Sequence, residues 1–129
     1  MQAAIWVTIG AAIGGMARFW ISGFVARRMG ETFPWGTLLV NISGSFVIGL
    51  ATTLGGPGAD VMGGPTVRLF LTTGICGGYT TFSSFSLQTL NLAREGEWGA
   101  VAGNVLFSVV LCILAAYLGV LAGTALTPR

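Results

Sequence analysis

The sequence predicts an all-α integral membrane protein with four transmembrane helices, and its composition, its length and the position of its charges indicate this class. Of the 129 residues, 53% are apolar and only 8% are charged, and the mean hydropathy is +0.83. Such values are typical of membrane proteins and not of soluble domains. Each bilayer span needs roughly 20 apolar residues, so the chain has room for about four spans and little else. We therefore interpret residues 1–129 as a single four-helix transmembrane domain.

The first span is predicted over residues 3–25, which are apolar apart from three positions. Arg18 is the unusual residue, because it lies more than two helical turns inside the interface that Arg27 and Arg28 mark. Two interpretations of Arg18 stay open. The guanidinium either snorkels to the interface and anchors the helix end, or it faces a vestibule or pairs with loop backbone.

The second span is predicted over residues 35–54, with Pro34 suited to the first helical turn and Trp35 to the interfacial belt. Asn41 is the candidate functional residue of this span. An unpaired amide in hydrocarbon is costly, so its side chain must face protein or water. Thr37 precedes Asn41 by one turn and lies on the same stripe. Asn41 could also serve packing alone, through an interhelical hydrogen bond.

The third span is predicted over residues 67–92, and the rest of the chain is organised around its middle. Two glycines and two threonines, all poor helix formers, fall within residues 77–81, so we expect the helix to break there. Unwound backbone at membrane depth is tolerated only where it is buried in protein or lines a water-filled cavity. Its carbonyls become candidate cation ligands, and its N–H groups and hydroxyls become candidate anion donors.

Two phenylalanines follow this break on one helical face. Phe82 and Phe85 are three residues apart, with Ser83 and Ser84 between them. The spacing alone also fits ordinary core packing. The position after a break, beside hydroxyls, favours a site for an ion.

The fourth span is predicted over residues 98–126 and carries a mildly polar stripe of Asn104, Ser108 and Cys112, four residues apart. A lone serine in a membrane helix usually bonds the carbonyl four residues before it, whereas a stripe aligned with the polar residues of the second span would line a path. Cys76 and Cys112 both lie inside predicted spans. We expect them to be small buried side chains and not a disulfide.

Pairs of glycines four residues apart give two of the spans small-residue faces that let another helix approach closely. Such a face occurs once in the first span and at both ends of the fourth. The pairs are Gly10 with Gly14, Gly99 with Gly103, and Gly119 with Gly123.

The arginines at the span ends are nearly balanced between the two sides of the membrane. With four spans, Arg68 and Arg129 lie on one side, and Arg27, Arg28 and Arg94 lie on the other. Two against three is almost no bias for the positive-inside rule, so the chain is expected to insert in both orientations. No internal repeat is found, so an inverted symmetry would have to come from two copies.

Several functions are excluded by residues that the sequence lacks. The chain has no histidine, and Glu31, Asp60, Glu95 and Glu97 are its only carboxylate side chains, all outside the predicted spans. Metal sites and catalytic triads of the usual kinds therefore cannot form in the membrane, and we do not expect an enzyme. A net charge of +2 without a long basic run argues against the binding of nucleic acid. The N-terminus has no basic region before its apolar run, so we expect no cleaved signal peptide.

Three segments together resemble the Fluc (CrcB) family of small fluoride channels. They are GGMAR at residues 14–18, GTLLVNISGSF at 36–46 and GICGGYTTFSSFS at 74–86. The likeness covers all four spans, and the glycine-rich break before Phe-Ser-Ser-Phe is its specific part. It implies an antiparallel, dual-topology homodimer with two pores in the bacterial inner membrane. Such a channel exports fluoride passively and relieves its toxicity, with fluoride, a second copy and membrane lipid as partners.

The resemblance also implies positions for the ions. It places a structural sodium ion at the dimer interface, held by backbone carbonyls that map to Gly77 and Thr80. We assign Arg18 a structural role and not a place in the pore. The implied anion pore is lined by Asn41, by Phe82 and Phe85, and by the hydroxyls of Ser83, Ser84, Ser108 and Thr37.

These residue types suit an anion on physical grounds. An anion that enters the membrane must exchange its water shell for protein donors, and Asn, Ser and Thr supply neutral ones. The edge of a phenylalanine ring is the positive end of its quadrupole, so it can meet an anion edge-on. A buried sodium would lower the barrier for a nearby anion. Selectivity for fluoride over chloride comes from the resemblance alone.

Two other functions are weighed against the channel. A small multidrug exporter also has four spans, but exporters of that kind resemble one another in carrying protons on a carboxylate inside the membrane. No predicted span here contains Asp or Glu. A non-transporting accessory subunit would use the glycine faces for packing. Such a subunit would need neither Asn41 nor the broken helix with its hydroxyl stripe.

Overall fold

The computed structural model describes residues 1–56 and 63–127, and all their regular secondary structure is helical, as the sequence predicts. The part of the second loop that carries Asp60 and the C-terminal Arg129 lie outside the described residues. The elements in chain order are α1 (Gln2–Met29), α2 (Trp35–Leu54), α3 (Pro65–Leu69), the π-helix η1 (Phe70–Cys76), α4 (Gly77–Tyr79), α5 (Phe82–Arg94) and α6 (Trp98–Leu126).

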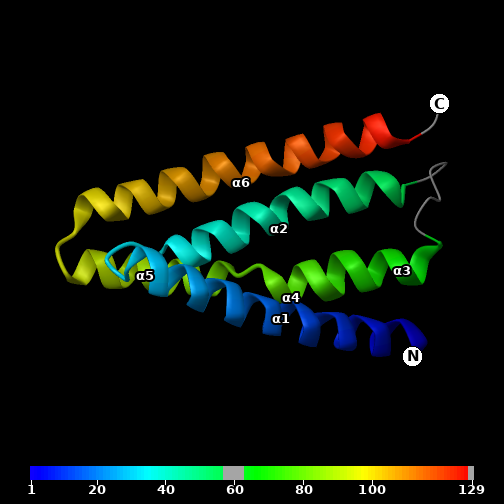
Figure 1. Cartoon of the computed structure of the whole chain (residues 1–129), viewed down its shortest axis with the longest axis horizontal. Helices are drawn as coiled ribbons and strands as arrows, with labels where there is room; N and C mark the ends of the chain where they lie inside the picture. Colours follow the sequence, from blue (N-terminus) through cyan, green and yellow to red (C-terminus); the bar gives the residue numbers. More distant parts are fainter. Residues whose placement is uncertain (57–62, 128–129) are drawn as a thin grey trace.

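Three of these helices, α1, α2 and α6, are long and apolar enough to cross a membrane. They correspond to the first, second and fourth predicted spans, and many of their large apolar side chains are exposed, as a lipid environment requires. The third path runs through α3, η1, α4 and α5 in succession, from the end of the molecule where α1 begins to the opposite end (Figure 1). The start of α1 and the end of α6 lie at the same end (Figure 1).

The π-helix η1 packs backbone-to-backbone against α1 through glycines. A Cβ on Gly10 would lie 2.7 Å from the Phe70 carbonyl oxygen, and one on Gly14 would overlap the Ile75 carbonyl. On the facing side, a Cβ on Gly74 would lie 3.1 Å from the Gly10 Cα. The close approach predicted for the first glycine pair is therefore used within the chain.

Helices α2 and α6 pack in the same way at one end only. A Cβ on Gly119 would overlap the Phe46 carbonyl, and one on Gly123 would lie 2.7 Å from Thr53 Cβ. The small-residue face at the other end of α6 is not used within the described chain, so the close approach expected there stays a prediction. A Cβ on Gly99 would meet no described atom within 4 Å, and one on Gly103 would meet only aromatic side chains, the nearer at 3.7 Å.

The third path is interrupted at two threonines. Helix α4 ends at Tyr79, Thr80 and Thr81 are extended with ψ of 158° and 115°, and α5 begins at Phe82. The two glycines before this point remain helical, and Gly78 packs closely on α1, where a Cβ would lie 2.8 Å from Ala11 Cα. Gly78 therefore serves helix packing, and the interruption falls on the two threonines at the end of the predicted range, residues 77–81.

Candidate functional site

Asn41 of α2 supplies hydrogen-bond partners to the backbone where the third path is interrupted. Its Nδ2 donates to the Thr81 carbonyl at 3.0 Å, and the Thr81 N–H donates to its Oδ1 at 2.8 Å. In a continuous helix that N–H would donate to the Gly77 carbonyl. The amide is thus paired with backbone from another element, which is the interhelical bond that the sequence left open, and one of its two N–H donors remains for a further partner.

Thr81 also caps the helix that follows the interruption. Its Oγ1 accepts from the Ser84 N–H at 3.2 Å and lies 3.2 Å from Ser83 Oγ and 3.1 Å from Ser84 Oγ. Three hydroxyls therefore gather at the N-terminus of α5, where the helix dipole is positive. Hydroxyls and a positive helix end together favour a negatively charged ligand.

A cavity of about 380 Å³ lies beside this helix end, among α2, α5 and α6. It brings together four of the predicted pore residues, Asn41, Phe82, Phe85 and Ser108. The two phenylalanine rings lie 5.2 Å apart between centroids, with 45° between their planes. Phe82 is 77% exposed, so packing in the core of a single chain does not account for it.

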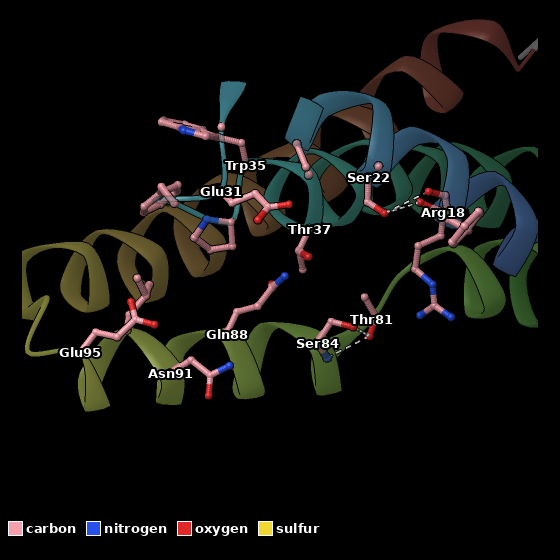
Figure 2. A pocket seen from close by; sticks show the side chains of 18 of the residues that line it. Arg18, Ser22, Glu31, Trp35, Thr37, Thr81, Ser84, Gln88, Asn91 and Glu95 are labelled. Carbon is pink, nitrogen blue, oxygen red and sulfur yellow. Dashed lines mark hydrogen bonds between the residues drawn. The ribbon is translucent and has the colours of Figure 1, made fainter. Parts of the chain in front are cut away.

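A larger cavity of about 670 Å³ lies at the end of the molecule where α1 joins α2 and α5 joins α6. Figure 2 shows Thr37 and Gln88 facing it from opposite walls, with Ser84 on the same wall as Gln88. Thr81 lines both cavities and therefore lies between them, at the interruption. Of the predicted pore residues, Thr37 and Ser84 line this larger cavity, and Ser83 lines neither one.

Arg18 lies in the wall of the larger cavity, on the α1 side (Figure 2). The residue is half-buried, and its guanidinium makes no hydrogen bond or ion pair with any other described residue. Two carboxylates, Glu31 and Glu95, line the same cavity and are exposed. Of the two interpretations of Arg18, the vestibule agrees with this position.

Two residues of the polar stripe of α6, Asn104 and Ser108, have different surroundings. Asn104 is 2% exposed and donates from Nδ2 to Thr89 Oγ1 at 2.9 Å, while that hydroxyl donates to the Phe85 carbonyl at 2.7 Å. Asn104 therefore ties α6 to α5. Ser108, by contrast, lines the smaller cavity with a buried Oγ that has no partner among the described residues. The stripe is not a continuous track of free donors.

The backbone at the interruption offers oxygen ligands to a cation. The Thr80 carbonyl accepts no hydrogen bond from the described residues, and the usual donor to the Gly77 carbonyl is bound to Asn41 instead. Neutral carbonyl oxygens suit a hard cation such as sodium. Among the described residues, no group of three or more His, Cys, Asp or Glu residues could hold a metal ion. The residues at Gly77 and Thr80 therefore fit an alkali ion better than a transition metal.

Sequence reasoning missed two residues that the structure places in the site. Thr81 is the hub that joins Asn41, Ser83 and Ser84, and the sequence signal for it is a threonine immediately before a helix start. Gln88 lines the larger cavity with a buried Oε1 that has no partner among the described residues. Its position one turn beyond Ser84 is the only sequence signal for it.

Comparison with known proteins shows close relatives over nearly the whole chain. The family model described as "CrcB-like protein, Camphor Resistance (CrcB)" matches residues 5–120. The "Fluoride-specific ion channel FluC" of Methylocella silvestris is 56% identical over 115 residues, which cover 89% of this chain and 88% of the relative. The protein of the same name from Opitutus terrae is 52% identical over 126 residues, 98% of this chain and 96% of the relative. "Fluoride-specific ion channel FluC 2" of Rhodopseudomonas palustris is 54% identical over 119 residues, 92% and 91% of the two chains.

Proposed function

Because this chain belongs to the CrcB family, we propose that it is a fluoride-selective channel that exports fluoride passively and so relieves fluoride toxicity. It is a multi-pass protein of the bacterial inner membrane and not an enzyme. Its relatives carry the name of fluoride-specific ion channels. The absence of Asp and Glu from the membrane-crossing helices α1, α2 and α6, and from residues 65–92 of the third path, supports passive conduction, since no carboxylate there can carry a proton.

The observation that carries this proposal is the convergence of Asn41, Phe82, Phe85 and Ser108 on one cavity at the interrupted third span. An anion there would meet the free N–H of Asn41, the hydroxyl of Ser108 and the edges of two rings. Each is a neutral or weakly positive group, so the ion is stabilised without being trapped.

The larger cavity would serve as the aqueous approach to this path. Arg18 is its one cationic lining residue in the described chain, has no partner there, and would attract an anion to the α1 wall, while the exposed Glu31 and Glu95 also line this cavity. From there an anion would reach Thr37, Ser84 and Thr81, and then the rings. Since Thr81 borders both cavities, the step between them lies at the Asn41–Thr81 hydrogen bonds.

The complete channel would be an antiparallel homodimer of dual topology with two pores. The arginine balance of two against three supports insertion in both orientations. The exposure of Phe82, at 77% in the single chain, supports a second copy that completes the wall of the path. The third span would then be a transmembrane helix broken near its middle, at Thr80 and Thr81.

A structural sodium ion would lie at the dimer interface, held by the carbonyls of Gly77 and Thr80. When bound, it would supply a fixed positive charge beside the anion path. The chain's own part is to present these carbonyls, because Asn41 takes the N–H that would otherwise occupy the Gly77 oxygen. Gly44 of α2 supports this arrangement by leaving room for Thr80, since a Cβ there would overlap the threonine methyl.

Fluoride efflux from liposomes tests the proposal. Purified protein in fluoride-loaded vesicles should release fluoride rapidly, as read by a fluoride electrode, once valinomycin carries the compensating potassium. Release that depends on valinomycin is expected for a passive channel. Release driven by a proton gradient without valinomycin would indicate an exporter, and no release at all would indicate the accessory subunit.

A further inference from the structure

The chain's two cysteines, both in segments that we assign to the membrane, differ in surroundings. Cys76 is 3% exposed and lines neither of the two cavities described above. Cys112 of α6 is half-buried and lines the smaller cavity, together with Ser45 and Ser108. Only one of the two thiols therefore faces the path proposed for the anion.

The residue one turn before Cys112 gives an independent sign that this part of the cavity can take a ligand. Ser108 is 9% exposed, and its Oγ is buried with no hydrogen-bond partner among the described residues. A buried hydroxyl without a partner is uncommon and leaves both a donor and an acceptor to be satisfied. Residues four apart lie on one helical face, so this oxygen and the Cys112 sulfur point to the same side of α6.

We propose that Cys112 and Ser108 form a binding site for a soft, thiophilic monovalent cation, represented by Ag⁺, and that the bound cation inhibits ion flux. Thiolate sulfur selects soft metals, and the hydroxyl oxygen adds a weaker neutral ligand. The silver ion forms a bond to the Cys112 sulfur, the S–H bond breaks, and the proton leaves to water. No oxidation or reduction takes place.

Inhibition follows from the position of the thiol. The S–Ag group would project into a cavity of about 380 Å³ whose wall also contains Asn41, Phe82 and Phe85. Water and anions that pass these residues would meet the bound metal. The effect on flux rests on the proposed channel function, whereas the binding of silver does not.

The experiment compares the parent with Cys112→Ser and with Cys76→Ser, which is the matched control. Silver bound per chain is titrated in detergent by the ultraviolet absorbance of the silver–thiolate bond. Fluoride efflux is measured from liposomes with and without silver, each variant against itself. Nitrate replaces chloride, because silver chloride is insoluble whereas silver fluoride dissolves.

We expect silver to slow parental efflux about tenfold and to leave Cys112→Ser within about twofold of its own rate, while Cys76→Ser stays as sensitive as the parent. If Cys112→Ser does not fold, Cys112→Ala replaces it. Ser108→Cys should bind silver at least about tenfold more tightly, because two sulfurs on one face suit a two-coordinate metal.

The site is wrong if Cys112→Ser binds silver as the parent does, or if Cys76→Ser alone loses the silver absorbance. An unchanged affinity in Ser108→Cys would show that the two side chains do not share a ligand. If the parent releases no fluoride before silver is added, the channel function fails, and the absorbance titration still decides the metal site.

Discussion

Replacing Asn41 separates its two contributions, holding the backbone of the interruption and offering a donor to the anion. Asn41→Ala removes both hydrogen bonds to Thr81, each of which stabilises the fold by about 1 kcal/mol. Thr81 is 7% exposed, so its N–H and carbonyl would lose their partners away from water, at about 1–3 kcal/mol for each unpaired group. Partial relaxation reduces this sum, and we expect a loss of about 2–4 kcal/mol.

Asn41→Asp has a different profile. The carboxylate still accepts from the Thr81 N–H, but it cannot donate to the Thr81 carbonyl and places a partly buried negative charge against that oxygen, so the stability loss should be at least as large as that of the alanine variant. Fluoride flux should nevertheless be blocked, because a negative charge faces the path. Flux should recover as the pH falls, since the protonated acid is neutral and can donate again. Asn41→Ser, which keeps a neutral donor, should retain more flux than the aspartate variant.

Two measurements on each variant decide between these contributions. Unfolding in detergent, followed by circular dichroism, should give a higher midpoint for the parent than for either variant. Efflux from liposomes at neutral pH gives the lowest flux for Asp. Parental flux through Asn41→Asp would show that the anion does not pass this residue, and a parental unfolding midpoint for Asn41→Ala would show that the Thr81 bonds do not hold the interruption.

Three further predictions address packing, the aromatic rings and topology. Gly14→Ala should destabilise the protein by about 1–3 kcal/mol in detergent unfolding, because its Cβ overlaps the Ile75 carbonyl; Gly15→Ala, with no described atom within 4 Å, should cost nothing. Phe82→Ile and Phe85→Ile should lose most fluoride efflux in a dimer that still assembles by gel filtration, since bulk is kept and the positive ring edge is lost; near-parental efflux in both would return the rings to packing. Two or three lysines added to one loop should fix the orientation and abolish activity, and co-expression with an oppositely biased copy should restore it; full activity of the fixed form alone would contradict the antiparallel dimer.

Hydropathy and interfacial residues were sufficient to predict most helix boundaries. The second and fourth spans begin at tryptophans and end where predicted, at Leu54 and Leu126. The first helix extends beyond the predicted range, to Met29, because the arginines at its end continue the helix into the interface. These boundaries follow from local composition, which the sequence carries directly.

The middle of the third path could not be predicted in detail, because tertiary contacts decide it. The four poor helix formers predicted an interruption within residues 77–81, but only the fold shows that it falls on Thr80 and Thr81 while Gly78 stays helical in close contact with α1. The cost of an unpaired amide predicted that Asn41 has a partner, but only the fold identifies that partner as the Thr81 backbone. Likewise, the spacing of the α6 stripe could not show that Asn104 is bound to Thr89 while Ser108 has no partner in the described chain.

Other parts of the candidate site depend on a second copy and on ions, which one chain does not contain. The sodium site at Gly77 and Thr80, the two pores and the antiparallel arrangement therefore remain predictions. The exposed ring of Phe82 bears on the dimer prediction, because the antiparallel arrangement requires a partner chain to cover that ring. A structure of the dimer with bound ions would test them together.

Selective fluoride conduction is measured most directly in a planar bilayer, with purified protein, fluoride on one side and chloride on the other. For a channel of the proposed kind, the current is carried by fluoride, and the reversal potential lies far from zero, with the sign that opposes fluoride leaving its side. A reversal potential near zero, with chloride carrying an equal current, would contradict fluoride selectivity. The absence of any fluoride current from correctly inserted protein would contradict the channel itself.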